Sequence, residues 1–264
     1  VNHLDIQPLN FQISGSFAHD PNPLVPENMV PTQEGVRVRR ADLGVCFDGD
    51  ADRCIITDET GQIIGCDHLT ALLAEHFLER DPGKAVIYDL RSSKVVEEVI
   101  RDRGGEPRMC RVGHVFMKAL LREIDGIFGG ELSGHFYFRG NYYADSGAIT
   151  FAALLSVLGQ SDRPLSELIA PYRKYPQSGE INFRNDDKDG TLATLKKKYA
   201  KDATITELDG VTVDAFDTLG WWFNVRASNT EPLLRLNAEA KDAEVLRQLL
   251  DEIKPLLGEE AKGH

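Results

Sequence analysis

The sequence lacks any run of apolar residues close to the roughly 20 that a membrane-spanning helix needs, and no positively charged, apolar leader opens it. It also lacks an excess of positive charge. Its 42 aspartate and glutamate residues outnumber its 30 lysine and arginine residues, which gives a formal net charge of −12. An acidic surface repels nucleic acids and anionic lipids. We therefore expect no nucleic acid and no membrane among the partners of this protein.

Paired cysteines are lacking as well. The sequence contains no CxxC pair and no histidine at zinc-finger spacing from a cysteine, and three of its four cysteines lie in apolar, strand-like stretches. This pattern predicts reduced core cysteines in a cytoplasmic protein without disulfides or zinc. The cysteines are Cys46, Cys54, Cys66 and Cys110.

The first part of the chain has little regular periodicity. Residues 1–40 contain four prolines between Pro21 and Pro31. This composition predicts irregular structure or an extended connection, although a helix could begin within Val36 to Arg40. Two short apolar runs, Leu43–Phe47 and Cys54–Thr57, then predict strands on either side of an acidic loop. With 264 residues, of which 42% are hydrophobic, the chain is long enough for two or three compact units.

From about residue 65, short apolar runs alternate with amphipathic helical patterns, which indicates an α/β unit with a largely parallel sheet. Asp67 is predicted to cap the first helix of this unit, and Ser92 or Ser93 the second. After a linker near Tyr172 the strands and helices follow an α+β order. We predict an α/β fold of doubly wound mixed-sheet domains followed by a C-terminal α+β domain. The predicted domains are 1–62, 63–174 and 175–264.

Three aspartates alternate with small residues in the segment Asp48-Gly-Asp-Ala-Asp-Arg53. Carboxylates this close repel one another unless a cation compensates, and hard divalent cations take oxygen ligands. A solvated acidic turn is the alternative, but three alternating aspartates between two apolar strands are uncommon in such turns. We predict that Asp48, Asp50 and Asp52 bind Mg²⁺ and that Arg53 offers a positive charge to a substrate phosphate.

A calcium-binding EF-hand loop is a second interpretation of this segment. Counted from Asp48, positions 3, 5 and 12 of such a loop would be Asp50, Asp52 and Glu59, all of them acidic. Two features exclude the EF-hand. Its sixth position, which requires glycine, is Arg53, and the flanking segments have the pattern of strands rather than helices.

Polar residues follow three successive predicted strands of the α/β unit. They are Arg91, His114 and the segment Gly129-Gly-Glu-Leu-Ser-Gly-His135. Ligands of open parallel sheets bind beyond the carboxyl ends of the strands, so we expect a shared pocket here. Glu131 and Ser133 are placed to hydrogen-bond sugar hydroxyls, and the final histidine is either a binding or a structural residue. The glycines would let a ligand approach the backbone closely.

The segment Arg226-Ala-Ser-Asn-Thr-Glu-Pro232 follows another predicted strand and gathers a guanidinium, two hydroxyls, an amide and several backbone N–H groups. This is the inventory of a phosphate-binding loop, although a polar hairpin loop would have a similar composition. Arg235 on the next predicted strand supports the first interpretation. The candidate phosphate ligands are Arg226, Ser228, Asn229, Thr230 and Arg235.

Three of these segments resemble motifs of the α-D-phosphohexomutase superfamily, specifically its bacterial phosphomannomutase/phosphoglucomutase branch, and they occur in the same order. They are Asp48–Arg53, Gly129–His135 and Arg226–Pro232. The resemblance covers nearly the whole chain and suits the second, third and fourth domains of that family. It implies Mg²⁺ as cofactor and the interconversion of hexose 1- and 6-phosphates, of mannose or glucose, through a phosphoserine enzyme and a bisphosphate. It also implies that His114 and Arg91, together with Arg53, assist catalysis by proton transfer or electrostatics.

The resemblance is incomplete at one point, because the serine loop of the family's first domain does not occur in the chain. Phe17-Ala-His-Asp-Pro-Asn-Pro23 is only superficially similar, since it contains no serine. We therefore expect a C-terminal portion of the enzyme, inactive alone, with the missing N-terminal domain as a partner. Two alternatives stay open. One is phosphoglucosamine mutase, whose relatives usually have glutamine in place of Leu132, and the other is an inactive phosphosugar-binding fragment.

Overall fold

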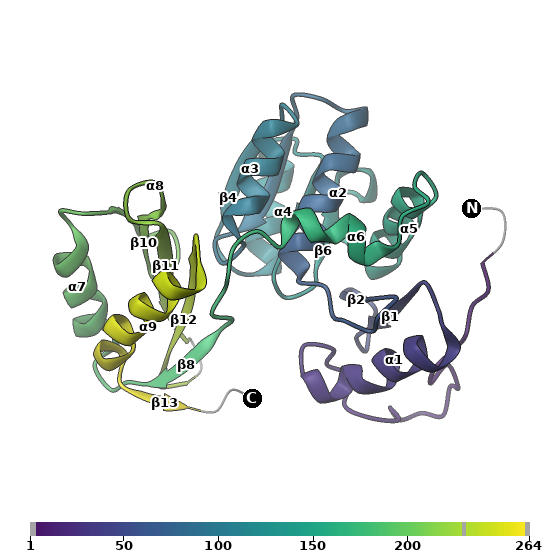
Figure 1. The fold of residues 1–264 in the computed structure, drawn as a ribbon, viewed down its shortest axis with the longest axis horizontal. Helices are drawn as coiled ribbons and strands as arrows, with labels where there is room; N and C mark the ends of the chain where they lie inside the picture. The colour runs from purple at the N-terminus through teal and green to yellow at the C-terminus, as the bar shows by residue number, and fades with distance from the viewer. Residues whose placement is uncertain (1–3, 229–230, 262–264) are drawn as a thin grey trace. The chain divides into compact units, whose positions relative to one another are not determined.

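A computed structural model describes residues 4–228 and 231–261 of the chain (Figure 1). The chain divides into two compact units, the first ending at Arg173 and the second beginning at Lys174. Each unit contains its own hydrophobic core. Among the described residues, no helix is both long enough and apolar enough to cross a membrane.

The first unit begins with an irregular segment, a helix and a hairpin. Residues 4–25 are irregular, as predicted, but Pro26–Arg39 forms helix α1, so the prediction is wrong for that part of the segment. Pro26 fits because the first residue of a helix needs no hydrogen-bond donor. Strands β1 (Leu43–Phe47) and β2 (Cys54–Asp58) then pair antiparallel and hold the acidic loop between them, as predicted.

Strands and helices alternate through the remainder of the first unit. The strands are β3 (Ala85–Asp89), β4 (Glu106–Cys110), β5 (Phe128–Gly130), β6 (Phe136–Phe138) and β7 (Ala144–Asp145). The helices are α2 (Cys66–Arg80), α3 (Lys94–Asp102), α4 (His114–Glu123), α5 (Gly147–Leu158) and α6 (Leu165–Ile169), with the 3₁₀ helices η1 (Arg139–Asn141) and η2 (Ala170–Tyr172).

These strands form a mixed sheet in the order β4-β3-β5-β6-β7. The pairs of β3 with β4 and with β5 are parallel, whereas β6 and β7 are antiparallel additions. Helices pack on both faces of β3. Val86 and Tyr88 belong to the core that contains α2 and α3, and Ile87 belongs to a second cluster with Met117 and Leu121 of α4. The doubly wound mixed sheet is therefore confirmed.

Helix starts are set by local hydrogen bonds. Ser93 and Ser146 accept N-cap bonds at the starts of α3 and α5. Asp67 does not cap α2, because that helix already begins at Cys66. The buried Asp67 carboxylate instead accepts a hydrogen bond from the Ser93 N–H at 3.1 Å, which joins α2 to the start of α3.

The glycine pair of β5 has a packing role. A Cβ atom on Gly129 would collide with Ile87 of β3, and one on Gly130 would collide with Thr70 of α2. Close approach of a strand and a helix to β5 therefore explains both glycines, rather than the predicted approach of a ligand.

The second unit is an antiparallel sheet with helices, which confirms the predicted α+β domain. The strand order is β13-β8-β12-β11-β10-β9. The strands are β8 (Ile181–Arg184), β9 (Thr204–Thr206), β10 (Val211–Ala215), β11 (Trp221–Ala227), β12 (Leu233–Ala240) and β13 (Glu259–Ala261). The helices are α7 (Lys188–Tyr199), α8 (Phe216–Leu219) and α9 (Ala243–Leu257). Phe223, Val225 and Leu236 of the sheet share a core with Leu195 of α7 and Ile253 of α9.

Candidate functional site

The acidic loop between β1 and β2 brings its three aspartates to one point. Asp48, Asp50 and Asp52 each offer a carboxylate oxygen within 4.8 Å of the other two. Ala51 adopts a left-handed conformation with φ 61°, and the Arg53 N–H donates to Asp48 Oδ1 at 3.1 Å, which closes the loop. The predicted metal ligands therefore converge as the sequence suggested.

The electrostatics of this loop fit a divalent cation. Burial, a hydrogen bond with Asp48 and the negative charges of Asp48, Asp50 and Asp145 raise the pKa of Asp52 to about 6. Asp52 Oδ1 is buried and makes no hydrogen bond with any residue that the structure describes. An all-oxygen ligand set with a buried oxygen that has no hydrogen bond suits Mg²⁺, and a bound cation would remove the repulsion among these carboxylates. Arg53 adds the one positive charge inside the loop, with its Nε 3.3 Å from Asp48 Oδ2.

The structure also bears on the calcium interpretation. Glu59, which would be the last ligand of an EF-hand loop, accepts hydrogen bonds from the backbone N–H and the hydroxyl of Ser166. It is therefore engaged away from the aspartates, and the segments that flank the loop are strands.

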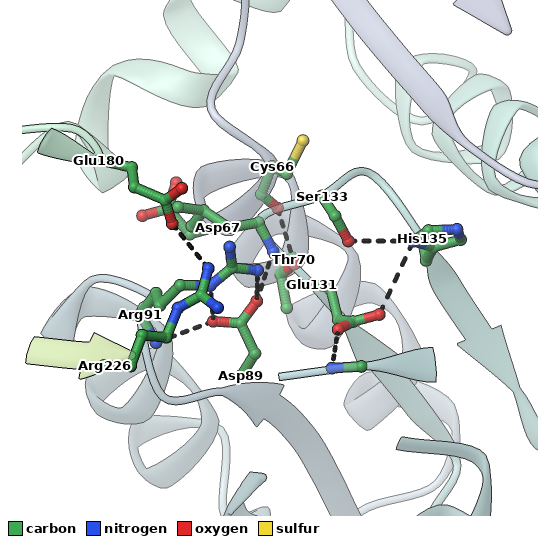
Figure 2. Close-up of polar contacts among 12 residues, drawn as sticks. Cys66, Asp67, Thr70, Asp89, Arg91, Glu131, Ser133, His135, Glu180 and Arg226 are labelled. Atoms are coloured by element: carbon green, nitrogen blue, oxygen red, sulfur yellow. Dashed lines mark hydrogen bonds and ion pairs between the residues drawn. The ribbon is translucent and has the colours of Figure 1, made fainter. Parts of the chain in front are cut away.

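Glu131 lies at the centre of a hydrogen-bond network between two strand-end loops (Figure 2). Its side chain is 2% exposed. Oε1 accepts from the Gly113 N–H at 2.9 Å, and Oε2 accepts from the Tyr137 hydroxyl at 2.5 Å. Burial and the charge of Glu131 raise the pKa of Tyr137, so the hydroxyl keeps its proton and remains a donor. Each carboxylate oxygen has a second lone pair, so the predicted contact of Glu131 with a sugar hydroxyl stays a prediction.

His135 joins this network to the metal loop. Its Nδ1 lies 2.9 Å from Ser133 Oγ and 3.7 Å from Glu131 Oε2, while its Nε2 lies 3.3 Å from Asp52 Oδ1. The backbone continues the junction, because the Cys54 N–H donates to the Gly134 carbonyl at 2.9 Å. Burial lowers the pKa of His135, which favours the neutral imidazole. Two loops that are 80 residues apart in the sequence thus form one site.

Arg91 is an internal residue of the same region, with a side chain that is 9% exposed. Its guanidinium donates to Asp89 through Nη2 at 2.8 Å and through Nε at 3.2 Å. Asp89 is fully buried, and burial alone would raise its pKa, but the Arg91 charge and the hydrogen bonds from Arg91 and Leu132 outweigh burial and lower it. Arg91 is therefore paired with Asp89, a contact that sequence reasoning missed, and the catalytic role of Arg91 stays a prediction. An acid at the carboxyl end of a buried strand was the available signal.

His114 begins α4 and is exposed. Lys118, one turn later on the same helix, places its Nζ 3.4 Å from His114 Nδ1 and 2.8 Å from Asp145 Oδ1. Asp145 in turn has a carboxylate oxygen within 4.8 Å of a carboxylate oxygen of Asp52 and of a ring nitrogen of His135. The predicted catalytic histidine thus contacts Lys118, which pairs with an aspartate near the metal loop, and the motifs included neither of these two residues. The i, i+4 spacing of His114 and Lys118 was a visible sign of this contact.

The second unit contains the predicted phosphate ligands. Arg226 at the end of β11 and Arg235 on β12 are direct cross-strand partners, and Ser228 is buried beside them at the start of the loop. Asn229 and Thr230 lie outside the described residues. The ammonium of Lys188 donates to the carbonyl of Ser228 at 3.1 Å and to that of Glu231 at 3.2 Å, which fixes both sides of the loop. No motif in the sequence indicated Lys188.

Comparisons with known proteins show the family of the chain. Family models for phosphoglucomutase/phosphomannomutase match at residues 1–61 (alpha/beta/alpha domain II), 66–175 (alpha/beta/alpha domain III) and 180–256 (C-terminal domain). A phosphomannomutase of Methanocaldococcus jannaschii is 41% identical over 94% of this chain and 55% of its own length. Phosphohexose mutases of Xanthomonas campestris are 42% identical over 92% of this chain and 54% of their length.

Solved structures show the same relationship. A phosphoglucomutase/phosphomannomutase family protein of Burkholderia thailandensis superposes with a TM-score of 0.83 and 32% identity, over 93% of this chain and 53% of that protein. The chain therefore spans about half the length of the relatives that it matches. With three family domains matched in order along the chain, the chain belongs to the phosphoglucomutase/phosphomannomutase family.

Proposed function

We propose that the chain supplies the metal, sugar and phosphate loops of a phosphohexomutase that interconverts hexose 1-phosphates and hexose 6-phosphates of mannose or glucose. The junction between the metal loop (residues 48–53) and the predicted sugar loop (residues 129–135) is the observation that carries this proposal. The Cys54 N–H to Gly134 carbonyl bond joins the two loops, and His135 Nε2 lies 3.3 Å from Asp52 Oδ1. A sugar bound by Glu131 and Ser133 would then have its reacting phosphate beside the aspartates.

Each group has a distinct task in this proposal. Asp48, Asp50 and Asp52 would hold Mg²⁺, which when bound supplies charge neutralisation to a phosphoryl group in transfer. Arg53 adds a fixed positive charge next to that phosphoryl group. In the second unit Arg226 would bind the phosphate that does not react, together with Ser228, Asn229, Thr230 and Arg235.

The nucleophile of the proposed reaction would be a phosphoserine on a partner N-terminal domain. Transfer to the sugar phosphate would form a hexose bisphosphate, and its other phosphate would return to the serine. His114 would assist by moving a proton or by electrostatic stabilisation. This chain by itself would bind hexose phosphates without turning them over.

The test combines binding and turnover. We expect calorimetry to detect glucose 1-phosphate binding to the full chain in the presence of Mg²⁺, and to detect none with Arg226→Gln. A protein that also contains the serine domain should interconvert the 1- and 6-phosphates of mannose and glucose. Absence of binding to the chain, or turnover by the chain alone, would contradict the proposal. Preferred binding of glucosamine phosphates would favour phosphoglucosamine mutase instead.

A further inference from the structure

We propose that Glu180 is an internal anion that competes with the substrate phosphate for Arg226 and Arg235 and thereby sets the affinity of the phosphate loop. This inference rests on the proposed function, because it concerns the same loop. It assigns a role to a residue that lies outside the loop motif, immediately before β8.

The geometry begins with the two arginines. Arg226 and Arg235 are directly opposite each other in the register of β11 and β12. Like charges in this position repel, so the pair needs an anion between or beside the guanidinium groups. A negative charge near the two arginines is therefore favourable even without a substrate.

Glu180 contacts both arginines with a single carboxylate, whereas Glu231 lies 3.6 Å from Nη2 of Arg235. Glu180 Oε2 accepts from Arg226 Nη2 at 2.8 Å, which Figure 2 shows, and Oε1 lies 3.3 Å from Arg235 Nη1. A phosphate binds arginine through the same guanidinium N–H groups and with similar two-point geometry. The carboxylate thus takes the place that a phosphate would need.

The carboxylate leaves part of the donor set unused. The Nε atoms of Arg226 and Arg235 are buried and have no hydrogen-bond partner among the described residues. A carboxylate offers two oxygens, whereas a terminal phosphate offers three and carries nearly twice the charge at neutral pH. A phosphate can therefore satisfy donors that Glu180 does not reach, which gives it an advantage in the exchange.

The Glu180 side chain can also move away from the arginines when a phosphate binds. Its side chain is 26% exposed, compared with 12% for Arg226, so the carboxylate lies nearer to solvent than the guanidinium that it contacts. Whether it moves or stays, its negative charge opposes phosphate binding. In the proposed reaction the other phosphate of the hexose bisphosphate returns to the serine, so the phosphate bound by the arginines must leave them between the two transfers. A Glu180 carboxylate that returns to the arginines would help this phosphate to leave.

The experiment measures binding of inorganic phosphate to the full chain by calorimetry. Glu180→Gln keeps the size and an acceptor oxygen of the side chain but removes its charge. We expect phosphate to bind about three- to tenfold more tightly to this variant. Glu180→Asp, which keeps the charge, should remain within about twofold of the wild type. Glu207→Gln is the matched control. It changes the net charge equally, but Glu207 pairs with Lys196, so this variant should bind phosphate like the wild type.

The sign of the change separates competition from simple positioning. If Glu180 served only to orient Arg226, phosphate would bind less tightly to Glu180→Gln, and that result or an unchanged affinity would overturn the inference. Adding Arg226→Gln to Glu180→Gln should abolish the gain. If phosphate binds to the wild type and no more tightly to Glu180→Gln, the inference about Glu180 is refuted but the proposed phosphate loop is not. Absence of binding to both proteins would refute the proposed phosphate loop together with it.

Discussion

The carboxylate of Asp89 accepts a hydrogen bond at 2.7 Å from the backbone N–H of Leu132, which lies 43 residues further along the chain. Asp89 ends β3, and Leu132 lies within the sugar loop. The same carboxylate pairs with Arg91. One buried acid therefore positions both a predicted catalytic arginine and the backbone of the predicted sugar-binding segment.

We predict that Asp89→Asn destabilises the first unit. The substitution removes the carboxylate from a buried ion pair, for which a loss of about 3 kcal/mol in the free energy of unfolding is typical. Urea denaturation would measure this loss. Glu97→Gln is the control, because it breaks a pair with the exposed Arg101 and should cost less than about 1 kcal/mol.

The effect of Asp89 also depends on pH in a defined direction. Because its pKa is lowered in the folded chain, the carboxylate stabilises the fold above the pKa of an unfolded aspartate, about 3.9, and this contribution is lost as the pH falls through the folded value. The difference in stability between the wild type and Asp89→Asn should therefore shrink below about pH 4. A difference that grows on acidification would contradict this assignment.

Secondary structure and local motifs could be predicted from the sequence, whereas contacts between side chains that are distant in the sequence could not. The alternation of strands and helices, the convergence of Asp48, Asp50 and Asp52, and the capping by Ser93 all followed from local rules. Helix α1 was missed because a count of prolines ignores their position in a helix. Tyr137 was not predicted as a partner of Glu131, because long-range register decides which side chains meet.

Glu131 and Tyr137 provide a second test of the network. Tyr137→Phe removes the hydroxyl that donates to the buried Glu131 carboxylate, and the hydrogen bond to a charged group suggests a loss of about 2 kcal/mol. Tyr199→Phe removes the same kind of bond to the half-exposed Glu252 and should cost about 1 kcal/mol or less. Urea denaturation measures the free energy of unfolding of both variants. Equal losses would show that burial of Glu131 does not strengthen its hydrogen bond with Tyr137.

The metal loop predicts a selective effect on Mg²⁺ binding. Asp50→Asn removes one of three converging carboxylates and should weaken Mg²⁺ binding to the full chain by at least about tenfold, because hard cations depend on ligand charge. Glu59→Gln is the control, since Glu59 is engaged with Ser166. Calorimetric titration with Mg²⁺ measures both variants, and a loss of affinity in Glu59→Gln would revive the EF-hand interpretation.

Lys118 is predicted to select the tautomer of His114. An ammonium only donates, so neutral His114 must accept at Nδ1 and carry its proton on Nε2. Nitrogen-15 NMR of the histidine ring should show the Nε2–H form in the wild type and a mixture of tautomers in Lys118→Met. Lys84→Met, which removes an exposed lysine paired with Asp125, should leave the spectrum unchanged. A wild-type spectrum with the proton on Nδ1 would refute the contact.

Lys188 should affect phosphate binding in the direction opposite to Glu180. Its ammonium holds the carbonyls of Ser228 and Glu231, so Lys188→Met releases both ends of the loop between them and removes a positive charge. We expect inorganic phosphate to bind about three- to tenfold more weakly. Lys196→Met loses the same charge from a lysine that pairs with Glu207 and should bind phosphate like the wild type. An equal loss in both variants would mean that net charge, rather than the shape of the loop, determines the affinity.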